Sequence, residues 1–447
     1  MIRTIVFLAK LLVLGLIVLW VVDQSGPVTA TWTLGGESYR IYTNSGWVLL
    51  LAVLAVMAIW LLAQGWNALA RWPERIGHRR ERKRLEKSLE AMAQGYLALS
   101  AGDVKAATAQ AARIDRLMDN PQATLLLKAE TARVAGDESR AKELYTRMLE
   151  HEGLEPAGLR GLLSQAQKEG RLDEALSLAR RVHERMPKAP WALTALFDLL
   201  VKNRHWTEAA ETLKTMTKQK ILPTDTVRRY SVALAVEMSR EAEAIGYTDE
   251  ARKHAARATS LDPGHVPAAL QYARLLLAAG KASRTLRVLE AAWQKNPHPD
   301  VARLYMGLGQ GLKPLGRVKQ AERLLALAAD NPESHLALAE TALEAQLWGE
   351  ARNHLMRAVA LSPSARAFRL LARLDSEERR DAESARQWLE KAVSAGPDPL
   401  WSCGTCGTET PSWQAVCSHC QSFDTVTWTP PRASTAVQPL PRLPDGI

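Results

Sequence analysis

The hydrophobic positions of this 447-residue chain follow different patterns along its length. Two continuous apolar runs stand near the start, at residues 4–22 and 46–63, and Lys10 is the only charged residue in either. From about residue 85 to 397, apolar residues recur in a repeated pattern that suits pairs of short helices. Residues 398–428 form a short stretch that does not follow the repeated pattern. The pattern predicts a mainly α-helical chain with membrane-spanning helices at its N-terminus and a small separate domain at its C-terminus.

Both apolar runs are long enough to cross a membrane as helices. They have 19 and 18 residues, which at about 1.5 Å per residue matches a hydrocarbon layer of about 30 Å. Trp20, Trp47 and Trp60 stand near their ends, where indole rings favour the headgroup region. A cleaved signal peptide is the alternative for the first run, but that run is longer than a usual signal core and a second run follows. We therefore predict a transmembrane hairpin within residues 1–70.

The charges that flank the two apolar runs predict the orientation of the transmembrane hairpin. The connecting loop, residues 23–45, has a net charge of −1, whereas residues 64–90 carry eight Lys or Arg against four Glu. Because basic flanks stay in the cytoplasm, both chain ends are expected on the cytoplasmic side of a bacterial inner membrane. Within the loop, TATWTLGGESYRIYT (29–43) alternates around two glycines and predicts a two-stranded ribbon on the outer face.

The basic segment at residues 71–84 accounts for much of the net charge of +10. Its place beside the second run predicts contact with anionic lipid headgroups. The lipid-facing side chains are expected to be Arg79, Arg80, Arg82, Lys83 and Arg84. No aromatic platform or nucleic-acid motif accompanies them, so nucleic acid is not an expected partner.

A period of 34 residues runs through the middle of the chain. The phrases AGDVKAA, AGDESRA and EGRLDEA place Gly102, Gly136 and Gly170 at this spacing, and six further turn positions align with them. The fifth residue after the turn is small: Ala107, Ala141, Ala175, Ala209, Ala251, Thr285, Ala321, Ala351 and Ala385. A small residue lets two helices pack closely, while a glycine or polar turn reverses the chain. These features resemble the tetratricopeptide repeat, which implies about nine repeats over residues 85–397, stacked as an α-solenoid.

The period is interrupted in two places. A spacing of 42 precedes Gly246, which predicts a longer loop or helix around residues 217–232. Spacings of 36 and 30 on either side of Gly316 nearly cancel. Prolines stand seventeen residues after five of the turn positions, where a second helix should end.

Tetratricopeptide arrays curve so that the first helices of the repeats line a concave groove, and such arrays supply binding surfaces far more often than catalysis. The side chains expected in the groove are basic and mixed, which suits an acidic or extended polypeptide partner. They are Arg160, Lys168, Trp191, Lys202, Arg240, Arg274, Arg303 and Lys313. A solvated face without a ligand would carry such residues equally well. No catalytic motif is found, so the protein is not expected to be an enzyme.

All four cysteines lie in two CxxC knuckles, Cys403-Gly-Thr-Cys406 and Cys417-Ser-His-Cys420. Two such knuckles can bring four thiolates to one metal ion as a tetrahedral site. Gly407 follows the first knuckle and can adopt positive φ, whereas Gln421 follows the second. The predicted mini-domain, residues 398–428, is too small to fold without a metal ion or a cross-link to stabilise it. Structural zinc is therefore expected.

Other uses of the thiols compete with structural zinc. Disulfides are disfavoured in the reducing cytosol that the charge rule predicts for this segment. Covalent haem attachment needs a histidine directly after CxxC, and a redox dithiol needs a βαβ setting. Iron in the same four-sulfur site is the remaining alternative to zinc and would bring redox activity. Residues 429–447 hold five prolines and are expected to be a disordered tail.

A two-span hairpin, a short outer ribbon, a basic stretch and tetratricopeptide repeats together resemble the bacterial HemY family. Residues 10–90 carry the resemblance, including DQSGPVTATW (23–32) and RWPERIGHRRERKR (71–84). The resemblance implies an inner-membrane protein associated with haem biosynthesis, with haem-synthesis enzymes as candidate partners. No catalytic residue is established for the family, so none is carried over.

The C-terminal knuckles are similar to the rubredoxin-type zinc ribbon of LapB, a membrane-anchored tetratricopeptide adaptor that controls proteolysis in lipopolysaccharide synthesis. In that resemblance Cys403, Cys406, Cys417 and Cys420 match the metal ligands. LapB has a single span and two are predicted here, which favours HemY. The sequence thus predicts a non-enzymatic scaffold linked to haem synthesis. A LapB-like adaptor and a rubredoxin-like electron-transfer protein are the alternatives.

Overall fold

The computed structural model describes residues 26–34, 37–70, 72–118 and 122–430, with five isolated positions between 13 and 23. Within these residues the chain divides into two compact units, Met1–Asp137 and Glu138–Ile447. The first unit begins with an antiparallel pair of strands, β1 (Pro27–Leu34) and β2 (Glu37–Asn44), with Leu34 opposite Glu37. The two-stranded ribbon predicted between the apolar runs is therefore confirmed.

Four helices follow in the first unit: α2 (Ser45–Ala70), α3 (Trp72–Ser100), α4 (Val104–Leu117) and α5 (Gln122–Val134). The predicted basic segment is the first half of α3, which continues into the first repeat. Ala91 on α3 packs with Ile114 of α4 and Leu127 of α5 in a small buried core. This core holds the last turns of α3 against the start of the array.

The transmembrane hairpin is not confirmed. Across the part of the chain that the structure describes, no helix combines the length and apolar character that a bilayer crossing requires. The first predicted span, residues 4–22, lies almost wholly outside the described residues. The hairpin, its orientation and its location remain predictions from the sequence.

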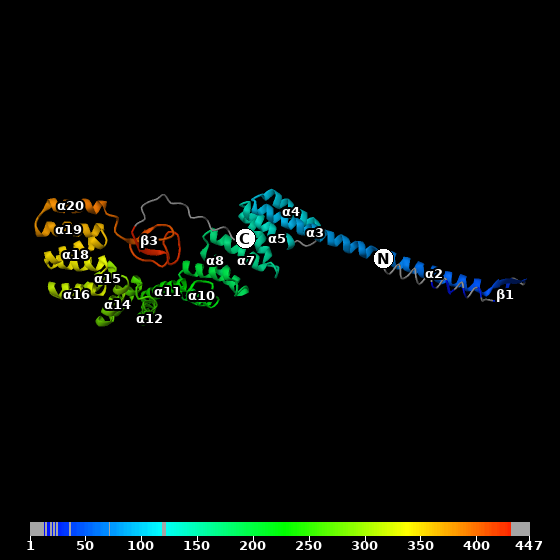
Figure 1. Ribbon diagram of the computed structural model, residues 1–447, viewed down its shortest axis with the longest axis horizontal. Coiled ribbons are helices and arrows are strands. Elements are labelled where there is room, and N and C mark those ends of the chain that lie inside the picture. The colour runs from blue at the N-terminus through cyan, green and yellow to red at the C-terminus, as the bar shows by residue number, and fades with distance from the viewer. Residues whose placement is uncertain are drawn as a thin grey trace. The chain divides into compact units, whose positions relative to one another are not determined.

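The second unit is a mainly helical tetratricopeptide solenoid, as predicted. Figure 1 shows its helices following one another in an arc from α7 to α20. Single helix α6 (Glu138–Met148) is followed by seven helical hairpins. Their helices are α7 (Glu155–Lys168), α8 (Leu172–Arg185), α9 (Pro190–Lys202), α10 (Trp206–Lys218), α11 (Thr224–Ala244), α12 (Thr248–Leu261), α13 (Val266–Ala278), α14 (Ala282–Lys295), α15 (Pro299–Gly307), α16 (Pro314–Leu327), α17 (Pro332–Glu344), α18 (Trp348–Leu361), α19 (Ala365–Glu378) and α20 (Ala382–Ser394).

The aligned turn positions share one backbone conformation. Eight of the nine adopt positive φ, five as glycine and three as Arg204, Gln346 and Arg380. Each lies just past the end of a first helix, where a left-handed residue lets the last carbonyl groups find donors. Gly170, for example, has φ of 71°, and the following Arg171 N–H donates to the Ala166 carbonyl at 2.9 Å. The 34-residue period therefore marks a real backbone feature.

The small residues after these turns are buried without exception. Eight have no exposed surface and Ala385 is 6% exposed. Helices α8, α12, α14 and α18 each end two residues before the proline that marks the predicted helix end, for example at Arg185 before Pro187. The repeat pattern thus predicted both the packing positions and the helix ends.

The two interruptions of the period have separate structural explanations. Helix α11 has 21 residues, whereas the neighbouring first helices α9 and α13 have 13 each, so the insertion lengthens a first helix at its N-terminal end. Helix α15 has only 9 residues and stops in a glycine-rich turn. Helix α16 then starts early at Pro314, so Gly316 lies inside it. Ala321 therefore comes about one turn further along its helix than the matching alanines of the other repeats, on the same helix face.

The chain closes with a three-stranded antiparallel sheet in the order β4-β3-β5. Its strands are β3 (Leu400–Cys403), β4 (Glu409–Thr410) and β5 (Val426–Thr429). We call residues 400–429 the ribbon. Figure 1 shows the ribbon, labelled β3, inside the arc of the helices of the second unit.

Candidate metal centre and its seat in the groove

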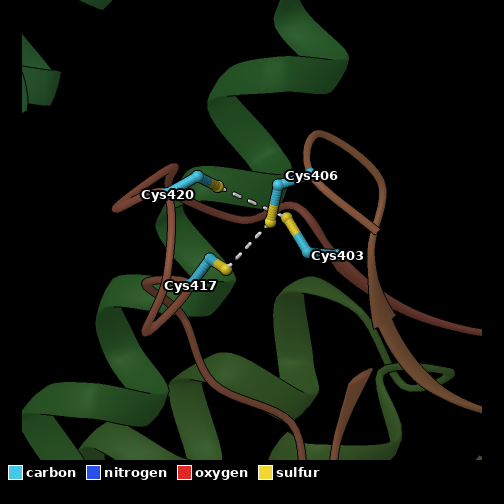
Figure 2. Close-up of side chains that lie close together, drawn as sticks. All are labelled: Cys403, Cys406, Cys417 and Cys420. Carbon is cyan, nitrogen blue, oxygen red and sulfur yellow. Dashed lines mark hydrogen bonds between the residues drawn. The ribbon is translucent and has the colours of Figure 1, made fainter. Parts of the chain in front are cut away.

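The four cysteines of the ribbon converge on one point (Figure 2). Their sulfur atoms all lie within 4.8 Å of one another, and none forms a disulfide. The Sγ atoms of Cys403 and Cys420 are 3.6 Å apart, and those of Cys406 and Cys417 are 3.7 Å apart. Zinc–sulfur bonds of about 2.3 Å in a tetrahedron require sulfur separations of about 3.8 Å. The residues present therefore fit a four-thiolate site for zinc or iron.

The two knuckles repeat one hydrogen-bonding pattern. The Cys403 N–H donates to the Thr408 carbonyl and the Cys417 N–H to the Ser422 carbonyl, both at 2.9 Å. The residue after each knuckle, Gly407 or Gln421, adopts positive φ, at 75° and 58°. The prediction for Gly407 is confirmed, and Gln421 adopts the same conformation in spite of its side chain. Each knuckle thus fixes two thiols in the same local frame.

The environment of the thiols favours metal-ready thiolates on one knuckle. Burial raises the pKa of Cys406, but hydrogen bonds with Thr408 and the neighbouring thiols outweigh it and lower the pKa to about 5. For Cys403, burial is likewise outweighed by hydrogen bonds, first from Thr425, and its pKa is lowered. Burial raises the pKa of Cys417 to about 11. A bound cation would draw the remaining protons off, since metal ligation requires thiolates.

The ribbon is seated on the first helices of the array through aromatic side chains. Phe423 meets Tyr230 of α11 edge to face, with ring centroids 5.0 Å apart, and Phe197 of α9 lies 5.7 Å away. Trp413 lies edge-on to His265 at 5.1 Å, and the Arg240 guanidinium stands over its ring at 5.3 Å. Such pairs contribute beyond the apolar area that they bury.

A second group of contacts involves the other two tryptophans. His298, which precedes α15, stacks on Trp401 at 5.4 Å and lies 4.4 Å from Trp428. Its Nδ1 accepts a hydrogen bond from the Asp300 N–H at 3.1 Å, so it also caps α15. The Nδ1 of His265 caps α13 in the same way through Ala268 at 3.2 Å. Burial lowers the pKa of both imidazoles to about 4, which keeps them neutral.

One ion pair anchors the tip of the ribbon. The Arg229 guanidinium lies 2.8 Å from the Asp424 carboxylate and also donates to the Asp424 carbonyl at 3.1 Å. Burial raises the pKa of Asp424, although the arginine opposes that shift. Arg229 and Tyr230 both belong to the N-terminal turns that lengthen α11. The insertion in the repeat pattern therefore builds the seat of the ribbon.

The predicted groove residues have several different surroundings. Arg240 contacts the ribbon, and the Arg160 guanidinium stands 5.1 Å over the Trp191 ring in an open part of the array. Lys202, Arg274 and Arg303 bond to their own helices, to Asp198, Gln271 and Asp300 respectively. Lys168 lies in the last turn of α7.

Lys313 differs from the prediction. It precedes α16 rather than lying on a first helix, because glycines end α15 early and Pro314 starts the next helix. In the basic segment, Arg82, Lys83 and Arg84 are exposed on α3, while the side chains of Arg79 and Arg80 lie outside the described residues.

Sequence reasoning missed the residues that seat the ribbon, above all Phe197, Tyr230, His265 and His298. They lie on or directly before four different first helices, and no local motif connects them. The 42-residue spacing was the one available signal, because it marked extra chain next to Tyr230.

Fold and site together define a tetratricopeptide-repeat protein whose groove holds its own four-cysteine ribbon. Comparison with known families matches residues 31–136 to the HemY protein N-terminus and residues 166–220 and 246–306 to a tetratricopeptide repeat. The chain therefore carries a HemY-type N-terminal region followed by tetratricopeptide repeats, as its sequence predicted.

Individual proteins resemble the chain at lower similarity. The probable magnetosome protein Mms48 of Magnetospirillum gryphiswaldense is 28% identical over an alignment of 457 positions that covers 95% of each chain. A solved tetratricopeptide repeat protein from Parabacteroides merdae is 15% identical over 69% of this chain and 99% of its own, with a TM-score of 0.30. The crystal structure of MamA is 13% identical over 35% of this chain and 93% of its own, with a TM-score of 0.25.

Proposed function

We propose that this protein is a non-enzymatic scaffold of the bacterial inner membrane that gathers protein partners around haem synthesis. The observation that carries the proposal is the union of a HemY-type N-terminal region with a tetratricopeptide array. Arrays of this kind present extended binding surfaces, and partner proteins are their usual ligands. Exposed Arg160 over the half-buried Trp191 ring, and the space beside the ribbon, offer such surfaces here.

Membrane attachment is part of the proposal. The uncharged run at residues 46–63, the mostly apolar run at 4–22 and the basic flank at 71–84 support a two-span anchor with both ends in the cytoplasm. A fluorescent protein that folds only in the cytoplasm, fused after Ile447, should be bright, and alkaline phosphatase at the same site should be inactive. The opposite pair of results would refute the orientation.

The haem link is tested in cells. Deleting the gene should change the level of porphyrin intermediates and leave the enzymes of lipopolysaccharide synthesis at their normal abundance. Unchanged porphyrins together with altered lipopolysaccharide enzymes would instead support a LapB-like adaptor. The docked four-cysteine ribbon is the observation that supports this second candidate.

The identity of the metal decides between a structural and a redox ribbon. Zinc in the purified protein, with no visible absorbance, is the expected result and excludes electron transfer through the site. Iron with sulfur-to-metal absorbance would support a rubredoxin-like role.

Similarity to Mms48 supports another candidate, a role at the magnetosome, because that alignment covers 95% of both chains. A tagged copy that purifies with magnetosomes, in a host that makes them, would favour this role. A copy distributed over the whole inner membrane would favour the haem-related scaffold.

A further inference from the structure

The ribbon leaves part of the groove open. A cavity of about 700 Å³ lies between α15, α17, α19 and the edge of the ribbon. This volume falls in the range of about 300–1,000 Å³ that is typical of ligand-binding pockets. Met306, Leu336 and Ala337 supply apolar lining, and Trp428 of β5 lines it from the ribbon. The cavity is therefore a composite of the helical array and the ribbon.

The charged side chains around the cavity are already paired. Arg366 bonds to Glu333 at 2.6 Å and to Glu340 at 2.8 Å, and Arg317 bonds to Glu344 at 2.8 Å. A strongly charged ligand would have to break one of these pairs, leaving a partly buried charge without its partner. The lining thus favours a ligand with little net charge and apolar side chains.

A polar side chain remains for such a ligand. Gln310 is exposed at the cavity and has no side-chain hydrogen bond among those found in the described residues. A backbone carbonyl accepts from donors of this kind. An extended peptide offers carbonyls at regular intervals.

The same face already binds extended polypeptide. The linker before the ribbon lines the cavity, where Asp398 accepts the Arg366 N–H at 3.0 Å and pairs with Arg369. The adjoining stretch of the groove holds the ribbon through aromatic and cation–π contacts. The open cavity is continuous with this interface through Trp428, which contacts His298 at the start of α15.

We propose that the cavity binds an extended, uncharged segment of a partner polypeptide and is complete only while the four-cysteine ribbon is folded and docked. Trp428 lies opposite Trp401 in the sheet, and Val426 lies opposite the ligand Cys403. The metal site therefore holds one wall of the cavity in place. This inference rests on the proposed scaffold function and adds the partner's chemistry and the condition for its binding.

The test uses the full chain, loaded with zinc, and random peptides displayed on phage. Gly307→Leu places a side chain at the cavity where an added Cβ meets nothing within 4 Å, so the variant should fold. Gly349→Leu is the matched control, because that glycine is equally open but lies on α18, outside the cavity lining. Trp428→Ala removes the ribbon wall, and Cys403→Ser with Cys417→Ser removes the metal.

Peptides enriched on the intact protein are then measured in solution by fluorescence anisotropy. We expect Kd to rise at least about tenfold in Gly307→Leu, in Trp428→Ala and in the double cysteine variant, and to stay within about twofold in Gly349→Leu. We also expect the enriched peptides to be apolar and low in charge.

Peptides that bind Gly307→Leu as well as the intact chain would overturn the cavity, and binding that survives loss of the cysteines would overturn the dependence on the ribbon. Failure to enrich any peptide would also overturn the inference. The scaffold function is judged separately, by porphyrin levels in the deletion strain, so the two failures are distinguishable.

Discussion

At the residue scale, one backbone conformation recurs at the points where the chain reverses. Glycine occupies it at Gly102 and Gly407, whereas Gln346, Arg380 and Gln421 adopt it with side chains present. A residue with a Cβ in the left-handed region costs roughly 1–2 kcal/mol relative to the right-handed one. The surrounding hydrogen bonds must therefore hold these positions in place.

The second knuckle offers a direct test of that cost. Gln421→Gly should stabilise the ribbon by up to about 1 kcal/mol, because glycine adopts positive φ without the steric penalty. The Gln421 side chain makes one exposed hydrogen bond, to the Ser418 carbonyl at 3.2 Å, so the substitution removes little else. The measurement is the chelator concentration that releases half of the metal. The reverse change at the first knuckle, Gly407→Gln, should lower that concentration, and equal midpoints in all three proteins would contradict the argument.

At the element scale, α11, the longest first helix of the second unit, acts as a bracket for the ribbon. The extra turns of α11 carry Arg229 and Tyr230, and both meet the tip of the ribbon at Phe423 and Asp424. An insertion that first reads as an irregular repeat is thus the part of the array that recognises another element.

Removing the bracket's charge should loosen the ribbon without unfolding it. Arg229→Ala leaves the Asp424 carboxylate, which is 11% exposed, without its partner, and should weaken docking by about 1–2 kcal/mol. Hydrogen exchange of the β5 amides reports the change. Arg228→Ala is the control, since that residue pairs only loosely with Asp225 at 3.7 Å. Equal exchange in the two variants would show that the ion pair does not hold the ribbon.

Sequence patterns located the elements of this protein better than they located the contacts between them. Turn positions, helix ends and the four clustered cysteines all depend on spacing within a few residues, so they could be predicted from the order of residues. The Arg229–Asp424 pair joins positions 195 residues apart, and neither residue belongs to a motif. The two sequence signals, a long spacing and a cysteine pair, stood in separate regions. Nothing local could connect them.

At the scale of the whole molecule, the array should be independent of the metal while the groove is not. Each helical hairpin packs on the next, as α10 does on α11 and α12 on α13. The Cys403→Ser, Cys417→Ser double variant should therefore keep its far-ultraviolet circular dichroism and expose Trp413 and Trp401 to fluorescence quenchers. Ser418→Ala, which changes the same knuckle without touching a thiol, should behave as the intact protein. A large loss of helix in the double variant would refute this independence.

Acid should also loosen the ribbon. His265 and His298 have pKa values near 4 when docked and about 6.5 when exposed to water, so docking is fully favoured above pH 6.5 and weakens as the pH falls toward 4. Each imidazole contributes up to about 3 kcal/mol to that loss at pH 4. Asp262 and Asp300 oppose the shifts, Arg240 and Arg303 add to them, and the raised pKa values of Asp424 and Glu237 act in the opposite direction.

Tryptophan fluorescence followed from pH 7 to pH 4 should report this release. His298→Gln keeps a hydrogen-bonding side chain that does not titrate, so its transition should be shallower and shifted to lower pH. His254, a half-buried histidine of α12 with no contact to the ribbon among those found in the described residues, provides the control substitution, His254→Gln. A transition identical in all three proteins would show that the buried imidazoles do not govern docking.

The seat of the ribbon changes how the C-terminal end of the chain responds to force. Only a short linker separates α20 from the ribbon, which is held at α9, α11, α13 and α15. An unfolding machine that pulls on the C-terminus therefore loads the ribbon's contacts before it loads the last repeat. The last helical hairpins, which would unfold first in a solenoid without a ribbon, are protected until the contacts of the ribbon break.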